Sequence, residues 1–306
     1  MRKPLLIAIT GPTASGKSAL AVELATRLRT EIISADSRQI YKGIPIATAV
    51  PTEEERGGIP HHLLEVLELE DYFSASKFEE ESLKILEEIF KTSDVAVVCG
   101  GSMLYVDSLL YGIDELPTVP DELRNELMTE WKERGDAWLL GRLKELDNMY
   151  YERVDPNNLK RVFHAVEVSL TAGRPYSSLL GKERRARNFE YKKVCLGGDR
   201  NELFKRINRR TLEMIDKGLE DEARRVSAFR NLNSINTVGL KEMFLYFDGK
   251  FTREEAISRI QKNTRVYAKK QLTWHKRDDK AVWLNLTDGP KQNSSRILDM
   301  VLQKGY

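Results

Sequence analysis

Five short apolar runs recur along the chain, each of a length typical of a β-strand. They cover residues 5–9, 31–35, 95–99, 192–196 and 282–286. Between them, apolar side chains return every three or four positions, which is the period of a helix with one buried face. Strands that alternate with helices predict a parallel α/β sheet with right-handed crossovers.

Five stretches carry the helical period. The predicted helices cover residues 18–28, 77–91, 158–172, 201–217 and 252–274. In the third, the apolar stripe is Leu159, Val162, Val166 and Leu170, and Gly173 follows as a stop signal. No strand pattern appears between Gly112 and about Asn188, where turn residues lead into helices. We therefore expect an α/β core domain from residues 1–114 and 190–306, and an all-helical insertion domain at 115–189.

Residues 11–18 read GPTASGKS and lie between the first predicted strand and the first predicted helix. This order is that of a phosphate-binding loop, whose backbone N–H groups and positive helix end bind an anion. Lys17 adds a charge, and the Ser18 hydroxyl can ligate Mg²⁺. We expect a P-loop NTPase-like sheet that holds a diphosphate or triphosphate. The expected diphosphate-binding residues are Gly11, Pro12, Thr13, Ala14, Ser15, Gly16, Lys17 and Ser18.

Composition is that of a globular protein, with 306 residues, 41% of them hydrophobic and 31% charged. The N-terminal apolar stretch is too short to span a membrane and lacks a cleavage site, so we expect neither membrane contact nor a targeting signal. Cys99 and Cys195 each close an apolar run, which indicates buried strand ends rather than a metal pair. We expect a reduced, cytoplasmic monomer.

The net charge is only +2, so overall charge gives no argument for nucleic-acid binding. Basic residues are concentrated locally instead. One cluster consists of Lys182, Arg184, Arg185, Arg187, Lys192 and Lys193.

The predicted helix 252–274 carries a second basic cluster. It opens with a capping box, Thr252 and Glu255. The expected packing side is Ala256, Ile260, Tyr267 and Trp274, and the basic side is Lys262, Arg265, Lys269 and Lys276. The pattern leaves open whether this basic side follows an RNA backbone or is a solvated helix face.

The end of the strand 95–99 lacks a feature of hydrolytic NTPases. Such enzymes place an Asp there to help hold Mg²⁺. This strand is followed by Gly100 and Gly101, with no acid. Diphosphate as a leaving group becomes an alternative to nucleotide hydrolysis.

Asp36 follows the second predicted strand directly. Parallel strands end at the same sheet edge, where the phosphate loop also opens, so Asp36 should face the bound phosphates. Its carboxylate could accept a proton from an attacking hydroxyl or amine. The alternative is that Asp36 forms an Asx turn or a helix cap.

Arg210 lies on the apolar stripe of the helix 201–217, between Ile207 and Met214. An arginine that points inward needs an anion, because an unpaired buried charge is costly. A phosphate oxygen or a structural Asp could supply it, and periodicity does not separate the two.

Taken together, the motifs resemble the tRNA dimethylallyltransferases, also called isopentenyltransferases. The matching stretches lie in order over about 270 residues, nearly the whole chain. They include GPTASGKS, SADSRQIYKG, PIATAVPT, GIPHHLLE, YFSASKF, CGGSMLYVDSLLYG, DELP, DPNNLKRVFHAVEV with GRP, and AKKQLTWHKR.

The resemblance implies transfer of a dimethylallyl group from dimethylallyl diphosphate to the exocyclic amine of the adenosine 3′ of the anticodon. Diphosphate leaves. On this basis the phosphate loop would hold the diphosphate with Mg²⁺ at Ser18, Arg210 would neutralise the departing charge, and Asp36 would be the base. The target adenine would leave its stack to enter the site.

The resemblance also assigns tRNA contacts, with the helical insertion gripping the anticodon stem-loop. These are Asp36, Ser37, Arg38, Gln39, Ser102, Arg124, Lys160, Arg161, Val162, Phe163 and His164. The chain departs from the usual family pattern at Ser102, Lys160 and Leu240, where Thr, Gln and Tyr are more common.

Three other functions share some of these features. A small-molecule or nucleoside kinase would use the loop, Mg²⁺ and an Asp base. A nucleotide-gated RNA-binding module would use the loop only as a sensor, with Asp36 as a cap. A prenyltransferase of free adenine nucleotides would have less need of the helical insertion.

Overall fold

The computed structural model describes residues 3–181 and 185–302. Contacts divide the chain into two compact units. The larger comprises Met1–Tyr111 and Ala186–Tyr306, and the smaller comprises Gly112–Arg185. No helix in the described ranges has both the length and the apolar character needed to cross a membrane.

The larger unit is built on a parallel sheet of 6 strands in the order β3-β2-β4-β1-β5-β6. The five predicted strands are all present, and the α/β prediction is confirmed. The additional strand, β3, has only two residues, too few to leave an apolar run. The strands are β1 (Leu5–Thr10), β2 (Ile32–Ser34), β3 (His61–His62), β4 (Val95–Cys99), β5 (Glu190–Gly197) and β6 (Val282–Asn285).

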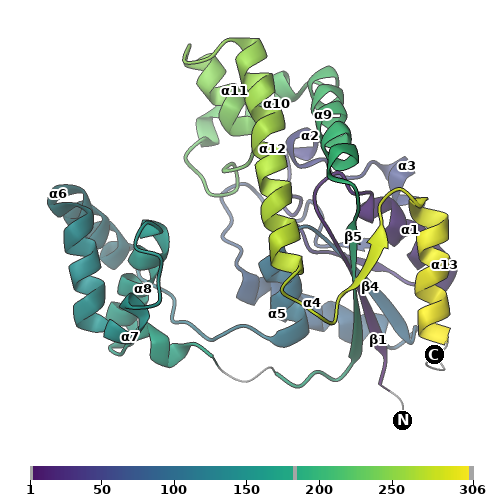
Figure 1. Ribbon diagram of the computed structural model, residues 1–306, viewed down its shortest axis with the longest axis horizontal. Coiled ribbons are helices and arrows are strands. Elements are labelled where there is room, and N and C mark those ends of the chain that lie inside the picture. The colour runs from purple at the N-terminus through teal and green to yellow at the C-terminus, as the bar shows by residue number, and fades with distance from the viewer. Residues whose placement is uncertain (1–2, 182–184, 303–306) are drawn as a thin grey trace. The chain divides into compact units, whose positions relative to one another are not determined.

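Helices cover both faces of this sheet, with α1 and α13 on one side and α4 and α5 on the other (Figure 1). Every residue of β1 is therefore buried, which explains why its sequence is apolar without alternation. The α-helices of this unit are α1 (Lys17–Leu28), α2 (Pro45–Thr48), α3 (Glu53–Arg56), α4 (Ala75–Ile89), α5 (Met103–Tyr111), α9 (Arg200–Asp216), α10 (Leu219–Arg225), α11 (Leu240–Phe247), α12 (Arg253–His275) and α13 (Gly289–Leu302). A 3₁₀ turn, η2, covers Ser227–Phe229.

The regular secondary structure of the smaller unit is all helical among its described residues. Its core joins Leu139 and Leu143 of α6 to Val162 and Val166 of α8. Helix α8 begins where expected, because the Asn158 side chain accepts a hydrogen bond from the Arg161 backbone. Its helices are α6 (Asp121–Leu146), α7 (Asn148–Tyr151) and α8 (Leu159–Ala172), followed by the 3₁₀ turn η1 (Tyr176–Leu179).

Two details of the sequence interpretation are tested directly by packing. Cys99 and Cys195 are buried free thiols, as expected. Tyr267 is wrongly placed on the packed side of α12, because 40% of it is exposed. The inward line of α12 continues from Ile260 to Ala268 and Gln271, which leaves Tyr267 on its flank.

Candidate active site

The phosphate loop connects β1 to α1 in a conformation that depends on glycine. Gly11 has φ 143°, and a Cβ there would lie 2.9 Å from the Leu196 carbonyl oxygen. Gly16 has φ 90° and immediately precedes Lys17, the first residue of α1. Because no acidic residue occupies the first turn of α1, the free N–H groups at this helix end keep their positive potential. The loop is shaped to bind an anion.

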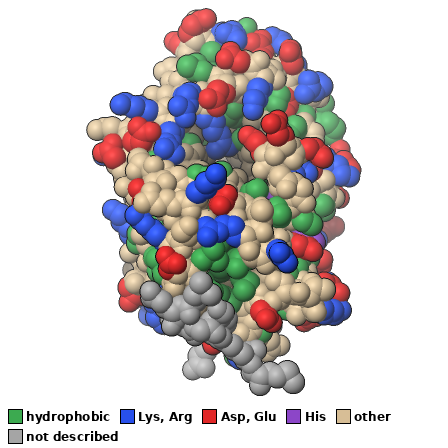
Figure 2. All heavy atoms as spheres, turned by 90° about the vertical axis from the view of Figure 1, so that its right-hand side faces the viewer, with side chains coloured by type: hydrophobic (Ala, Val, Ile, Leu, Met, Phe, Trp, Pro, Cys, Tyr) green, Lys and Arg blue, Asp and Glu red, His purple; other side chains and the backbone are tan. Residues whose placement is uncertain are grey.

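A cavity of about 900 Å³ opens over this loop, entirely within the larger unit. The segments after β1, β2 and β4 line it, together with α9, α12 and residues 45–52. Figure 2 shows a hollow in the upper half of one face, with Lys and Arg side chains around it. The Lys and Arg residues that line the cavity are Lys17, Arg38, Arg206, Arg209, Arg210 and Lys217.

Asp36 lies in this cavity at the end of β2. Its Oδ1 accepts hydrogen bonds from the backbone of Arg38 at 2.9 Å and of Gln39 at 3.3 Å. This is the Asx turn that the sequence left open. Among the described residues, Oδ2 has no hydrogen-bond partner, so the turn fixes the carboxylate and leaves one oxygen for a ligand.

Arg210 also lines the cavity, and its Nη1 donates to the Thr13 hydroxyl at 3.1 Å. Within the described ranges it forms no ion pair with a carboxylate, which favours a phosphate as its anion over a structural Asp. Burial lowers the pKa of Arg210, and the Asp36 charge opposes this shift. Burial likewise lowers the pKa of Lys17. Both cations are held away from bulk water. Their attraction for an anion is stronger there, because the surroundings have a lower dielectric constant than water.

Gln271 is a site residue that the sequence interpretation missed. It is 1% exposed on α12, its Oε1 accepts from the Thr13 backbone at 2.9 Å, and its Nε2 donates to the Gly101 carbonyl at 2.9 Å. The side chain therefore ties the phosphate loop to the turn after β4. The sequence signal was its position on the inward line of α12, among basic neighbours.

Residues 45–52 form a wall of the cavity that two side chains hold. Gln39 Nε2 donates to the carbonyls of Thr48 and Ala49 at 3.0 and 2.9 Å. The buried Glu222 carboxylate accepts from the backbone of Ile46 and Ala47 at 2.8 and 2.7 Å. Burial raises the pKa of Glu222. Glu222 was also missed, because its partners are backbone groups far away in sequence.

The residues expected to contact tRNA in the larger unit stand near Asp36. Ser37 and Arg38 line the cavity, and Arg38 Nη1 donates to the Asn233 carbonyl at 2.6 Å. The Ser102 hydroxyl accepts from the Ser37 backbone at 2.7 Å. Ser102 therefore braces the loop that carries Asp36.

In the smaller unit, the expected tRNA contacts divide by exposure. Lys160 and Arg161 are exposed at the start of α8. Arg124 and His164 are about half-exposed, and both bond to the buried Glu167 at 2.9 Å. Burial alone would raise the pKa of Glu167, but the hydrogen bonds from His164 and Arg124 lower it overall.

Val162 and Phe163 complete that set. They are 0% and 7% exposed and belong to the core of the smaller unit. Their side chains are not on the surface, so they support α8 rather than present a contact of their own.

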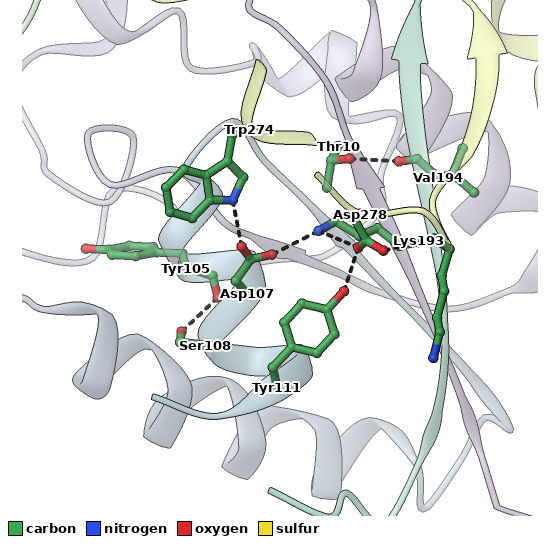
Figure 3. Close-up of polar contacts among 10 residues, drawn as sticks. Thr10, Tyr105, Asp107, Ser108, Tyr111, Lys193, Val194, Trp274 and Asp278 are labelled. Atoms are coloured by element: carbon green, nitrogen blue, oxygen red, sulfur yellow. Dashed lines mark hydrogen bonds and ion pairs between the residues drawn. The ribbon is translucent and has the colours of Figure 1, made fainter. Parts of the chain in front are cut away.

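In the basic cluster at 182–193, two of the described side chains pair with acids inside the fold. Lys182 and Arg184 lie outside the described residues. Arg187 pairs with the buried Glu79 at 2.8 Å. Lys193 is buried between Asp107 at 2.9 Å and Asp278 at 3.1 Å, as Figure 3 shows. Arg187 and Lys193 are therefore not available as surface contacts for RNA, whereas Arg185 is exposed and pairs with Glu115 at 2.7 Å.

The basic side of α12 includes side chains on the protein surface. Lys262 and Lys269 are exposed. Arg265 donates to the Asn208 side chain at 2.6 Å and lies 5.9 Å from the centre of the Phe204 ring. Lys269 lies 5.6 Å from the same ring. This side of α12 is cationic, with Lys262 and Lys269 exposed.

Comparison with known proteins gives one consistent result. The profile of the family described as IPP transferase matches residues 39–278. A tRNA dimethylallyltransferase 2 of Parabacteroides distasonis is 47% identical over 280 residues, which are 92% of this chain and 94% of the relative. A protein of the same name from Porphyromonas gingivalis is 45% identical over 296 residues, 97% of each chain.

Solved structures agree. A tRNA isopentenylpyrophosphate transferase from Bacillus halodurans superposes with a TM-score of 0.73 and 33% identity, over 99% of this chain and 97% of the other. A eukaryotic dimethylallyltransferase acting on tRNA reaches a TM-score of 0.79 at 24% identity, covering 92% of this chain and 74% of that one, which supports the fold.

Proposed function

The chain belongs to the IPP transferase family, and we propose that it transfers a dimethylallyl group from dimethylallyl diphosphate to tRNA. The acceptor is the exocyclic amine of the adenosine 3′ of the anticodon, and diphosphate is released. The observation that carries this proposal is that Lys17, Arg210 and Asp36 line the same cavity above the phosphate loop. It joins an anion site to a carboxylate base.

The diphosphate would bind to the backbone N–H groups of residues 11–18 and to the positive end of α1. As the allylic C–O bond breaks, negative charge grows on the diphosphate. Lys17 and Arg210 are already fixed there by their bonds to Pro12 and Thr13. Charges held in place before reaction stabilise the transition state without reorganisation.

Ser18 would hold Mg²⁺. Its hydroxyl is exposed at the start of α1 and lines the cavity. Among the described residues no cluster of three His, Cys, Asp or Glu side chains could hold a metal by itself. That suits Mg²⁺, which commonly takes one or two protein oxygens and fills its shell with substrate phosphates and water. When bound, the ion would supply charge neutralisation for the leaving diphosphate.

Asp36 would accept the proton. The amine nitrogen forms a bond to the allylic carbon, the C–O bond to diphosphate breaks, and one amine proton moves to the carboxylate. Because the Asx turn fixes Oδ1, the other oxygen is presented at a constant position. The target adenine must be extruded from its stack to reach this oxygen.

The smaller unit would bind the anticodon stem-loop. Lys160 and Arg161 on its surface, with the half-exposed Arg124 and His164, can contact phosphates. We propose these tRNA contacts together with magnesium as the cofactor, a cytoplasmic location and a monomeric state.

The absence of an acid after β4 argues against a nucleotide hydrolase, and the kinase alternative is separated by experiment. The discriminating experiment incubates the protein with Mg²⁺, dimethylallyl diphosphate and unmodified tRNA, then digests the tRNA and weighs its nucleosides by mass spectrometry. We expect a prenylated adenosine in tRNA and none when AMP replaces tRNA. Consumption of ATP without prenylation, or prenylation of AMP alone, would overturn the proposal.

A further inference from the structure

Helix α12 places one uncharged side chain between two loops of the cavity. We propose that Gln271 is a positioning residue for the transfer reaction, which holds the phosphate loop in register with the turn after β4 so that the diphosphate cations are correctly placed. This inference rests on the proposed function and extends it to a residue outside the phosphate loop.

Gln271 satisfies two backbone groups that have opposite requirements. The Thr13 N–H needs an acceptor and the Gly101 carbonyl needs a donor, and one primary amide supplies both at 2.9 Å. Because the side chain is 1% exposed, water cannot readily replace either bond. A buried backbone group that loses its partner costs more than an ordinary hydrogen bond contributes.

The turn after β4 is shaped to receive this amide. A Cβ at Gly101 would lie 2.7 Å from Gln271 Nε2 and 3.7 Å from Lys17 Nζ. A Cβ at Gly100 would lie 2.0 Å from the Ala35 carbonyl oxygen. Gly101 thus lets Gln271 and the phosphate-loop lysine approach the same backbone, while Gly100 lets the Asp36 loop approach it.

The bond from Gln271 reaches the diphosphate cations through one residue. The Thr13 backbone N–H donates to Gln271 Oε1, and the Thr13 hydroxyl accepts from the Arg210 guanidinium. If Thr13 moves, the position of Arg210 moves with it. Gln271 therefore acts on the transfer reaction through Thr13, not by touching the reacting atoms.

A partly buried polar network holds the end of the helix that carries Gln271. Figure 3 shows Trp274 donating to Asp107, which also contacts Lys193. The Trp274 Nε1 to Asp107 Oδ2 distance is 2.6 Å, and the Tyr111 hydroxyl donates to Asp278 at 2.6 Å. Asp107 lies on α5, which starts two residues after Gly101. The network therefore anchors both α12, which carries the donor Gln271, and the turn after β4, which carries the accepting Gly101 carbonyl.

The test compares Gln271→Met and Gln271→Glu with the wild-type chain and with a matched control, Gln261→Met. Gln261 lies on the same helix outside the cavity lining and donates to the Asn208 carbonyl at 3.3 Å. We expect Gln271→Met to lower kcat/KM for dimethylallyl diphosphate by about tenfold or more, with the Kd for tRNA unchanged. Gln261→Met should stay within about twofold of wild type.

The pH dependence of the activity of Gln271→Glu distinguishes a positioning role from a purely structural one. Its ionised carboxylate can accept from Thr13 but cannot donate to Gly101, whereas the protonated acid matches the amide in both bonds. Its activity relative to wild type should therefore rise by about fivefold or more from pH 8 to pH 6, given that burial raises a carboxyl pKa. The relative activity of Gln271→Met should stay constant over this range.

Binding of inorganic diphosphate with Mg²⁺, measured by calorimetry, separates this inference from the proposed function. If wild type binds diphosphate and Gln271→Met binds it at least about tenfold more weakly, the positioning role stands even when no tRNA is prenylated. Equal diphosphate affinity in both variants, a flat pH ratio for Gln271→Glu, or a parallel loss of tRNA affinity would each overturn it.

Discussion

Arg210 donates to the hydroxyl of Thr13 at 3.1 Å, so the helix that follows β5 reaches the loop that follows β1. Two residues 197 positions apart in sequence thereby fix one anion site. The helical period of the sequence predicted that Arg210 lies on the inward stripe of α9. Its partner there, the Thr13 hydroxyl, is neutral. The guanidinium charge is left for a ligand.

Replacing Arg210 with Lys tests this arrangement. The charge is kept, but the hydrogen bond to Thr13 and the planar fork that suits a phosphate are lost. We expect kcat for prenyl transfer to fall by about 10²-fold, with tRNA affinity within about twofold of wild type. Rapid-quench assays of diphosphate release and filter binding of tRNA measure the two quantities.

Arg296→Lys on α13 is the matched control, because Arg296 lies outside the cavity lining and pairs with Asp288. It should leave both quantities unchanged. A similar loss of kcat in both variants would show that the effect is not specific to the anion site.

Acidification should loosen the smaller unit through Glu167. The folded pKa of this carboxyl is lowered from 4.5, so its stabilisation is present above that value and is lost as pH falls through the folded pKa. Glu167→Gln should cost about 1 kcal/mol at pH 7, because the partners Arg124 and His164 are half-exposed. The cost should shrink at pH 3.

Hydrogen exchange of peptides from α8, corrected for intrinsic rates, measures this effect locally. Peptides from α1 in the other unit are the internal reference. An α8 difference between Glu167→Gln and wild type that is equal at pH 7 and pH 3 would contradict the assignment.

The cationic face of α12 makes a further prediction. Lys262 and Lys269 are exposed, and neither pairs with a carboxylate among the described residues. If this face contacts tRNA phosphates, each Lys→Ala change lowers the slope of log Kd against log salt by about 1. The control is Lys84→Ala, since Lys84 is held by Glu80 and Glu81 on α4. An unchanged slope in all three variants would assign the face to solvent.

The sequence predicted the sheet because strands buried on both faces leave continuous apolar runs. It did not predict β3, whose two residues are both His. The phosphate loop, Asp36 and Arg210 were identified because their chemistry depends on position next to a strand end or on a helix face.

Gln271 and Glu222 were not identified, and the reason is physical. Each bonds to backbone groups, which any sequence carries, and each partner lies far along the chain. Clustering along the sequence does not show which basic residues reach the surface, since Arg187 and Lys193 lie in one basic segment yet are paired with acids inside the fold. Only three-dimensional contact distinguishes these cases.

The most direct test of the central claim is the nucleoside mass spectrum of tRNA after incubation with dimethylallyl diphosphate and Mg²⁺, using wild type and Asp36→Asn in parallel. Asp36→Asn keeps the acceptor for the Asx turn but cannot take up the amine proton. We predict prenylated adenosine with wild type, and at least about 10²-fold slower formation with Asp36→Asn at unchanged tRNA affinity. Unmodified adenosine with wild type, or equal rates for the two proteins, would contradict this account.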